Sequence, residues 1–190
     1  MVRTTTPIGE FNQPVPDFVL ADTRERLWYL EDLVGPNGLL VMFICNHCPY
    51  VQAILPKIVR DTTELRTLGV HSVAIMSNDA SQYPEDSAEN MRRLAERWQF
   101  PFPYLHDETQ EVARAFGAVC TPDFFGYNKE LKLQYRGRMD ASGKESRPDA
   151  PRELFEAMRQ IAATGIGPQE QWPSIGCSIK WLPEPSSEED

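Results

Sequence analysis

The stretch FICNHCPYVQAI, residues 43–54, joins an apolar run to an amphipathic one and carries two cysteines at the junction. The run that leads into it, residues 39–44, is continuously apolar, as is typical of a strand buried on both faces of a sheet. From Val51 onward, apolar side chains recur at the spacing of one buried helical stripe. Pro56 lies inside that pattern, where its missing N–H and its ring predict a kink in the helix. The sequence therefore predicts a buried strand that passes directly into a helix at the two cysteines.

Strands and helices alternate on both sides of this junction. Before it, residues 18–20 and 27–30 predict the two short strands of an N-terminal β-hairpin, because a polar turn separates them. After it, residues 70–77 predict a second buried strand, and residues 87–98 predict a second helix with one apolar face. This order of strand, helix, strand and helix is typical of a parallel α/β unit.

The second half of the chain predicts antiparallel strands followed by a helix. Residues 123–127 and 131–136 predict a hairpin whose second strand alternates apolar with polar side chains. The last helix is predicted to begin at Pro151, and a proline-rich tail follows it. We therefore expect one domain over residues 1–165 and a C-terminal tail over residues 166–190, which packs in part on the domain and ends in a disordered acidic segment.

Charge and hydrophobicity restrict the partners of the chain. With 28 acidic side chains and 19 Lys and Arg side chains among 190 residues, the net charge of −9 disfavours nucleic acid, whose phosphates require clustered cations. Residues 1–11 contain no apolar segment of the kind found in signal peptides, and no stretch is long enough to span a bilayer. We expect a soluble cytoplasmic protein without a membrane partner, either a monomer or a weak homodimer.

The four cysteines, Cys45, Cys48, Cys120 and Cys177, are too few and too irregularly spaced for a secreted disulfide framework. The first turn of a helix offers unpaired N–H groups and the positive end of a dipole, which stabilise a thiolate and lower its pKa. Cys48 precedes Pro49 at the predicted helix start, whereas Cys45 belongs to the end of the strand. The residues alone therefore favour Cys48 as the nucleophile, with a purely structural role for either cysteine as the alternative.

A metal site is the other chemical interpretation of Cys45, His47 and Cys48. Structural zinc usually takes four ligands in two spaced pairs, and the sequence holds no second pair. We therefore predict neither a metal nor a cofactor.

Four blocks of sequence carry a family resemblance: FICNHCPYV at 43–51, CTPDFF at 120–125, YRGR at 135–138 and GCSIKW at 176–181. Together they resemble the peroxiredoxin-like 1 group of the thioredoxin superfamily, which is related to the AhpC/TSA and redoxin proteins, over residues 9–181. The resemblance implies an α/β thioredoxin fold, a central mixed sheet flanked by helices, with an N-terminal β-hairpin extension and a C-terminal tail. It also implies thiol redox chemistry, with the thiols and disulfides of proteins or small molecules, or peroxides, as partners.

The resemblance assigns the attacking thiol to Cys48. In thioredoxin-like proteins this cysteine follows a buried strand phenylalanine and precedes a helix-kinking proline at fixed spacings, and Phe43 and Pro56 both select Cys48 over Cys45. The sequence CPYV that begins at Cys48 is similar to the CPYC of glutaredoxins, with Val51 in place of the second cysteine. The usual resolving cysteine is therefore missing from its place in the helix.

Other cysteines are then candidates for that role. Cys45 is the second catalytic candidate, and Cys177 and Cys120 are the candidate resolving thiols. The resemblance implies that Pro122 is a cis-proline facing the active cysteine, and that Thr121 offers backbone groups to an extended thiol substrate. The implied substrate groove consists of Thr121, Pro122, Pro49, Tyr50 and His47.

We expect a thiol-disulfide oxidoreductase in which the Cys48 thiolate attacks a disulfide and a second thiol resolves the mixed disulfide. Two alternatives stay open. The first is an atypical thiol peroxidase in which Cys48 becomes a sulfenic acid; here Cys45 occupies the peroxiredoxin threonine position, and Arg136 and Arg138 lie beyond the position of the family's arginine. The second is a non-catalytic redox-sensing or binding module that uses the same groove for protein partners.

Overall fold

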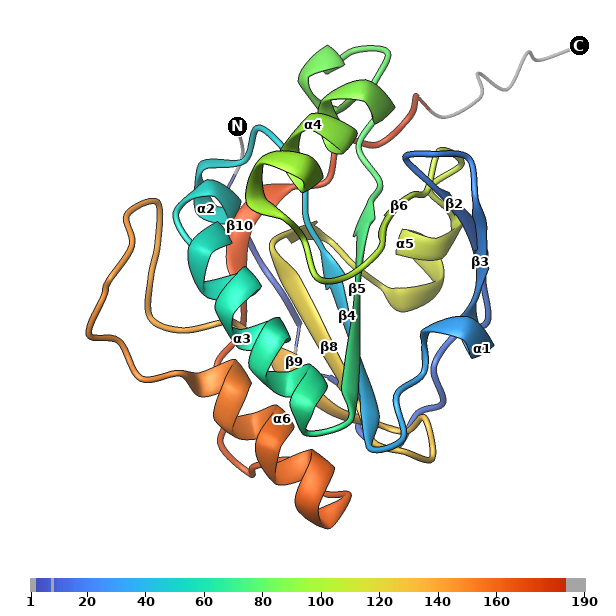
Figure 1. Ribbon diagram of the computed structural model, residues 1–190. Helices are drawn as coiled ribbons and strands as arrows, with labels where there is room; N and C mark the ends of the chain where they lie inside the picture. The colour runs from blue at the N-terminus through green and yellow to red at the C-terminus, as the bar shows by residue number, and fades with distance from the viewer. Residues whose placement is uncertain (1–2, 8, 184–190) are drawn as a thin grey trace, which may run out of the picture.

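The computed structural model describes residues 3–7 and 9–183, and its largest feature is a seven-stranded mixed sheet with helices on both faces (Figure 1). The strands are β1 (Arg3–Thr5), β2 (Val19–Asp22), β3 (Leu27–Tyr29), β4 (Gly38–Phe43), β5 (Val70–Met76), β6 (Tyr104–His106), β7 (Cys120–Thr121), β8 (Asp123–Tyr127), β9 (Leu133–Gly137) and β10 (Ile175–Ser178). The helices are α1 (Leu30–Leu33), α2 (Pro49–Gln52), α3 (Leu55–Thr67), the 3-10 turn η1 (Pro84–Asp86), α4 (Ala88–Trp98), α5 (Glu111–Phe116) and α6 (Glu153–Thr164).

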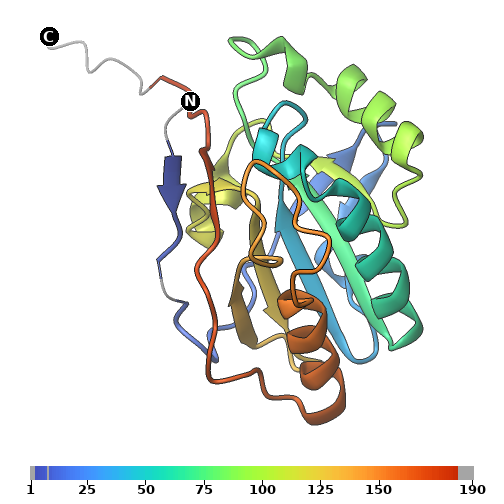
Figure 2. The same cartoon turned by 90° about the vertical axis from the view of Figure 1, so that its left-hand side faces the viewer.

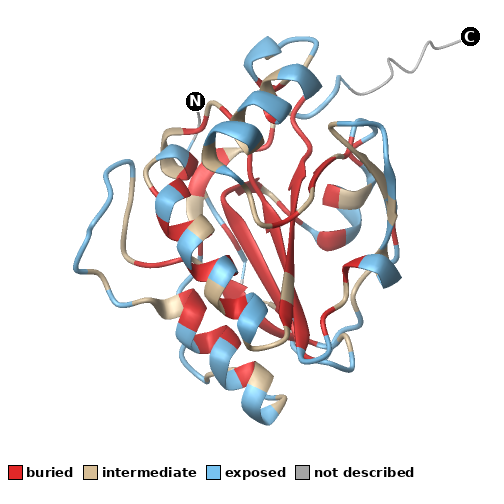
Figure 3. Ribbon diagram, in the orientation of Figure 1, coloured by how far each residue is buried: buried red, intermediate tan, exposed pale blue. Residues whose placement is uncertain are grey.

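Strand β4 lies in the middle of this sheet, whose order is β3-β2-β6-β5-β4-β8-β9. It pairs in parallel with β5 and antiparallel with β8, and all of its residues are buried (Figure 3). Because successive side chains of a strand point to opposite faces, Leu40 and Met42 pack with α3, α4 and α6, and Val41 and Phe43 pack with α1 and α5. The continuous apolar run before the cysteines therefore reflects burial on both faces, as predicted.

A second, three-stranded sheet has the order β1-β10-β7 and is antiparallel throughout (Figure 2). It joins the N-terminal strand to the C-terminal tail and to the short strand that carries Thr121. The sequence did not predict β1 or β10, because each is three or four residues long and has no hydrophobic alternation of its own. These strands form because a partner edge is already in place, which is a tertiary effect.

Most of the predicted elements are confirmed: the N-terminal hairpin is β2 and β3, and the strands and helices that follow the cysteines are present. The predicted kinked helix is instead two helices, since α2 ends at Gln52 and α3 begins at Leu55. Pro56 is in the first turn of α3, where the missing N–H needs no partner. The proline therefore starts a new helix and leaves α2 as a separate turn beneath Cys48.

Strand β9 has the predicted alternation of apolar and polar side chains, and it is covered on both faces. Its polar side chains Gln134 and Arg136 are buried. The N-terminal and C-terminal segments cover them: Gln134 Nε2 donates to Asn12 Oδ1 at 2.8 Å, and Gln171 Nε2 donates to the Gln134 carbonyl at 2.8 Å. The segments around Asn12 and Gln171, which are distant in sequence, therefore cover the polar face of β9. The short strand β6 was not predicted, and α6 begins at Glu153, two residues after Pro151.

The described part of the C-terminal tail runs from residue 166 to residue 183 and includes β10. The acidic end, predicted to be disordered, lies outside the described residues, and the division at residue 165 stays a prediction. In the described part of the chain, no helix is both long and apolar enough to cross a membrane.

A buried lysine attaches the loop that follows β9 to α3. The Lys57 ammonium forms an ion pair with the carboxylate of Asp140, and both side chains are almost fully buried. The same ammonium donates to Ser142 Oγ at 3.1 Å and to the Arg147 carbonyl at 2.6 Å. Lys57 therefore fixes the course of residues 140–147, which lie next to α2 and β10 (Figure 2).

Replacement of Lys57 by methionine is expected to lower the free energy of unfolding by about 3–5 kcal/mol, because it leaves the buried Asp140 carboxylate without its partner. Urea denaturation at neutral pH measures this loss. Lys129→Met, at an exposed lysine of the β8–β9 turn, is the matched control and is expected to change stability little. An equal effect of the two substitutions would show that the Lys57 ion pair contributes no more than a surface lysine.

Candidate active site

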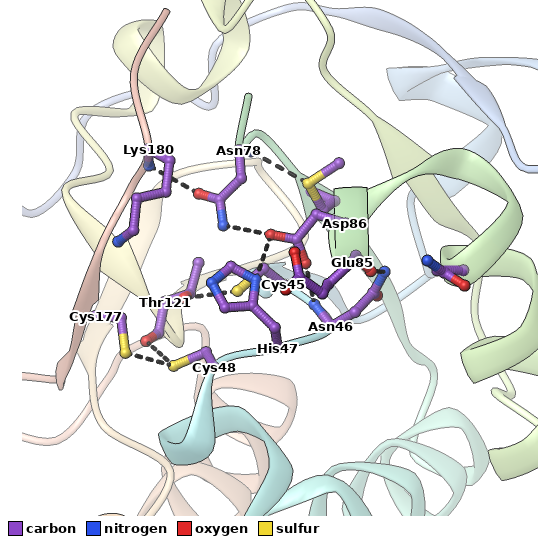
Figure 4. Close-up of polar contacts among 12 residues, drawn as sticks. Cys45, Asn46, His47, Cys48, Asn78, Glu85, Asp86, Thr121, Cys177 and Lys180 are labelled. Carbon is purple, nitrogen blue, oxygen red and sulfur yellow. Dashed lines mark hydrogen bonds and ion pairs between the residues drawn. The ribbon is translucent and has the colours of Figure 1, made fainter. Parts of the chain in front are cut away.

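Three of the four cysteines lie together where β4, α2 and β10 converge (Figure 4). Cys45 follows the end of β4, Cys48 is the N-cap residue of α2, and Cys177 lies in β10. The sulfurs of Cys48 and Cys177 are 3.2 Å apart, although the residues are 129 positions apart in sequence. The fold therefore brings the tail cysteine into contact with the predicted nucleophile.

Thr121 contacts both cysteines of the CNHC stretch. Its carbonyl oxygen lies 3.2 Å from Cys48 Sγ, and its Oγ1 lies 3.4 Å from Cys45 Sγ. The Thr121–Pro122 peptide bond is cis, which confirms the expectation from the resemblance. In the three-stranded sheet, Thr121 pairs with Cys177, so Thr121 also positions β10, the strand that carries the third sulfur.

Hydrogen bonds hold the pKa of Cys48 at about 5, well below that of a free thiol. The largest contribution is the hydrogen bond from Cys45, and further hydrogen bonds come from Cys177, the Thr121 side chain and the backbone of Val51. Burial acts in the opposite direction, because it disfavours the charged form. The hydrogen bonds outweigh burial, so Cys48 is a thiolate at neutral pH.

The other thiols stay protonated. The hydrogen bond between Cys45 and Cys48, together with burial, raises the pKa of Cys45 well above its usual value. Burial, together with the hydrogen bond to Cys48, raises the pKa of Cys177 to about 12. Burial also raises the pKa of Cys120, whose Sγ lies 3.7 Å from the Pro122 carbonyl. Of the four cysteines, Cys48 alone combines a low pKa with neighbouring thiol donors.

The sulfurs are shielded from solvent. Cys48 is 0% exposed, Cys45 is 1% exposed and Cys177 is 3% exposed. The close approach of β10 depends on Gly176, because a Cβ at this position would lie 1.9 Å from the Thr121 carbonyl oxygen. An incoming sulfur can therefore reach Cys48 only when β10 or α2 moves.

His47 faces away from the Cys48 sulfur, toward η1 (Figure 4). Its Nδ1 lies 2.7 Å from the carboxylate of Asp86, and its ring stacks on Tyr83 with a centroid distance of 5.7 Å. Asp86 is fully buried and accepts hydrogen bonds from the Asn46 N–H and the Asn78 side chain, each at 2.8 Å. This cluster fixes the turn between the two cysteines. The sequence analysis missed Asp86, since a lone aspartate after Pro84 gives no signal of burial.

A metal could use at most part of this cluster. One ligand atom from each of Cys45, His47 and Asp86 lies within 4.8 Å of the others. The Asp86 carboxylate already accepts two hydrogen bonds, and structural zinc usually takes four ligands. These donors fit a hydrogen-bonded turn better than they fit a metal centre.

Neither arginine of the YRGR block reaches the sulfurs through a described contact. Arg136 forms a buried ion pair with Asp123 at 3.1 Å, and burial raises the pKa of Asp123 to about 7 in spite of the nearby guanidinium. Arg138 makes two hydrogen bonds to Glu153, at 2.7 and 2.8 Å. Both guanidinium groups are thus engaged by carboxylates.

The remaining predicted groove residues lie around the sulfurs. Pro49 is the first residue of α2, and Tyr50 follows it. Tyr50 and Pro122 both line a cavity of about 240 Å³ beside the cysteines. Their role in binding a substrate stays a prediction.

Three features define a thioredoxin-fold protein: the mixed sheet, the cysteine at the start of a helix after a central strand, and the cis Thr121–Pro122 bond beside that cysteine. The sequence model of the AhpC/TSA family matches residues 11–136. The chain belongs to the AhpC/TSA family within the thioredoxin superfamily.

Similar proteins agree with this assignment. The chain is 42% identical to an uncharacterized conserved protein from Geobacillus kaustophilus, with a TM-score of 0.91 over 97% of this chain and 99% of that one. It is 36% identical to a hypothetical protein from Sinorhizobium meliloti 1021, with a TM-score of 0.88 over 94% and 97% of the two chains. It is also 25% identical over 139 residues, 70% of either chain, to the thiol-disulfide oxidoreductase ResA from Geobacillus thermodenitrificans (strain NG80-2). The family match and the similarity to ResA support thiol redox chemistry.

Loss of the Cys45 hydrogen bond is expected to raise the pKa of Cys48. Cys45→Ala should raise it by about one to two units, since a hydrogen bond to a charged group contributes about 1.5–3 kcal/mol. Cys45→Ser keeps a donor at the position and should leave the pKa closer to that of the wild type. The pH dependence of thiolate ultraviolet absorbance measures both. Equal pKa values in the alanine and serine variants would contradict the assigned donor.

Addition of a methyl group at Gly176 is expected to open the site. Gly176→Ala should push β10 away from Thr121 and speed the alkylation of Cys48 by iodoacetamide roughly tenfold, which corresponds to about 1.4 kcal/mol less favourable closure. Ser178→Ala, in the same strand, is the control and should leave the rate near that of the wild type. Circular dichroism would verify that both variants are folded, and an unchanged rate in folded Gly176→Ala would contradict the shielding role of β10.

Proposed function

We propose that this protein is a thiol-disulfide oxidoreductase in which Cys48 is the nucleophile and Cys177 is the resolving thiol. The observation that carries the proposal is the 3.2 Å contact between the two sulfurs, one with a pKa of about 5 and the other with a pKa of about 12. Two-step exchange requires a thiolate to attack and a second thiol within reach of the mixed disulfide. This contact supplies both.

The chemistry takes place in two displacements. In the first, the Cys48 thiolate attacks one sulfur of a substrate disulfide, the substrate S–S bond breaks, and one substrate thiolate leaves. In the second, Cys177 gives up its proton and attacks Cys48 Sγ, which releases the second substrate thiol and forms a Cys48–Cys177 disulfide. Two electrons pass from the cysteines to the substrate, and the Cys177 proton leaves with a substrate sulfur.

Cys45 has a different role in this proposal. It is a protonated donor to Cys48, and Thr121 Oγ1 lies 3.4 Å from its sulfur. A donor in this position stabilises the attacking thiolate and, later, the thiolate that leaves when an external thiol reduces the disulfide. Cys45 is therefore a positioning residue, and Cys177 closes the disulfide.

A thiol peroxidase is the second candidate function, and the observation that favours it is the shielding of Cys48. A sulfur that is 0% exposed suits a small oxidant such as hydrogen peroxide, and AhpC/TSA membership agrees with that chemistry. The thiolate would attack one peroxide oxygen, break the O–O bond, release hydroxide and become a sulfenic acid. The Cys177 thiol would then attack Cys48 Sγ, forming the disulfide as the S–O bond breaks and the oxygen leaves as water with the Cys177 proton. Arg136 and Arg138 are both engaged by carboxylates, so neither guanidinium is free to stabilise the leaving oxygen, which supports disulfide exchange as the better candidate.

Oxidation with a limiting small disulfide is expected to convert wild-type protein to a Cys48–Cys177 disulfide, read by mass spectrometry after differential alkylation. Cys177→Ser should stop at a mixed disulfide on Cys48, because it removes the thiol 3.2 Å from Cys48 Sγ and leaves only Cys45 beside it, whose raised pKa keeps it protonated. Cys120→Ser is the matched control and should form the same bridge as the wild type.

A Cys45–Cys48 bridge in the wild type would overturn the assignment of Cys177. Protein that keeps all four cysteines reduced would overturn the exchange function itself. Parallel oxidation by hydrogen peroxide separates the two candidate functions. A peroxidase requires the rate constant for oxidation of Cys48 by hydrogen peroxide to exceed the rate constant for its oxidation by the disulfide.

A further inference from the structure

We propose that the cavity beside the cysteines binds the carboxylate groups of an acidic low-molecular-weight disulfide, which is the substrate of Cys48. This inference rests on the proposed exchange function and specifies its substrate class. It depends on the position, the charge and the size of the cavity.

The cavity adjoins the sulfurs through three chain segments that line it. Tyr50 is two residues after Cys48, Ile175 is two residues before Cys177, and Pro122 follows the Thr121 carbonyl that contacts Cys48. The loop of residues 141–147 forms the outer wall and lies between the α2–α3 segment and β10 (Figure 2). None of the lining residues is a cysteine, so a disulfide held there contacts Cys48 only after α2 or β10 moves.

Three side chains on the cavity wall are cationic and unpaired in the described part of the chain. Arg3, Lys144 and Arg147 line the cavity, and no ion pair among residues 3–7 and 9–183 involves them. The other charged lining residues, Arg138 and Asp140, are neutralised by Glu153 and Lys57, respectively. The cavity therefore carries uncompensated positive charge on a chain whose net charge is −9. Such a local reversal of sign attracts anions.

The positive charge near the cavity also acts on the sulfur of Cys177. The Lys144 ammonium lies 5.8 Å from the centre of the Tyr50 ring, which ties it to the start of α2. Against the dominant effect of burial, the charge of Lys180 and, to a smaller extent, that of Lys144 lower the pKa of Cys177. Because the loop is attached to α3 through Lys57, the Lys144 cation stays near the sulfurs.

The size of the cavity favours a small molecule over a protein partner. Its volume of about 240 Å³ lies below the roughly 300–1,000 Å³ of ordinary ligand pockets. It suits one amino-acid-sized group of a small disulfide, whose carboxylate the Arg147 guanidinium can hold with two hydrogen bonds. In the first displacement this disulfide, RSSR, receives the Cys48 sulfur and releases RS⁻; in the second, the Cys48–Cys177 bond forms and RSH leaves.

The test compares three disulfides on the full-length protein: oxidised glutathione, which is anionic, 2-hydroxyethyl disulfide, which is neutral, and cystamine, which is cationic. The rate of Cys48 oxidation is measured for each by acid quenching and mass spectrometry. The double variant Lys144→Ala/Arg147→Ala should lower the rate of Cys48 oxidation by oxidised glutathione about three- to tenfold, as expected for the loss of two exposed charge interactions. The double variant should leave the rate of Cys48 oxidation by the neutral disulfide unchanged, and its rate of oxidation by cystamine should be unchanged or higher.

Two controls isolate the charge effect. Lys129→Ala/Arg159→Ala removes the same two residue types from exposed positions outside the cavity and should leave all three rates near those of the wild type. Added salt should slow oxidised glutathione with the wild type more than with the cavity variant. The neutral disulfide also reports any indirect effect of Lys144 on the cysteines.

The outcomes separate this inference from the proposed function. If 2-hydroxyethyl disulfide oxidises Cys48 and the cavity variant slows oxidised glutathione no more than the surface variant does, the anionic substrate is wrong and exchange stands. If none of the three disulfides oxidises Cys48 in the wild type, the exchange function fails, and the substrate class fails with it.

Discussion

A thiolate that is withdrawn from water must be stabilised by hydrogen bonds, and the structure of this protein around Cys48 satisfies that requirement. Each contribution comes from a different segment: Cys45 from the end of β4, the Val51 backbone from α2, Thr121 from β7 and Cys177 from β10. The low pKa of Cys48 therefore depends on the seven-stranded sheet, the broken helix and the three-stranded sheet together. A change that separates any of these segments acts on the same sulfur.

The C-terminal tail is part of the site because it is held on both sides of Cys177. Before the cysteine, the Thr6 N–H donates to the Ser174 carbonyl at 3.0 Å, which joins the tail to the N-terminal segment. After it, Lys180 N–H donates to Asn78 Oδ1 at 2.9 Å, and Gln110 Nε2 donates to the Lys180 carbonyl at 2.8 Å. A cysteine on a flexible arm would have to search for its partner, whereas Cys177 is held in a strand against Cys48. This arrangement limits access to Cys48, because β10, the strand that carries Cys177, also covers Cys48.

The sequence predicted the fold where the signal is local. The apolar run of β4 and the amphipathic helices predicted alternating strands and helices, because periodicity is a property of single segments. The thioredoxin architecture and the cis Thr121–Pro122 bond followed from the resemblance of four short blocks of sequence, and the role of Cys48 stays a prediction. The contact of Cys177 with Cys48 depends instead on β10 inserting between β1 and β7, and no short-range pattern encodes that pairing. Asp86 was missed for the same reason: its burial comes from Asn46 and Asn78, which reach it from other segments.

The distribution of arginines bears on which oxidant the site suits. Peroxide reduction develops negative charge on a leaving oxygen, and a guanidinium beside the sulfur stabilises it. In this chain Arg136 is buried against Asp123, and Arg138 is held by Glu153, so both cations are used for structure. Disulfide exchange needs no such group, because a thiolate carries its charge on a large sulfur and leaves more readily as its own pKa falls. Positive charge lies instead on the cavity wall, at Lys144 and Arg147, where it can bind the charged ends of a disulfide without contacting the reacting atoms. On the proposal above, these cations select the substrate by its carboxylates, and the hydrogen bonds to Cys48 stabilise the attacking thiolate.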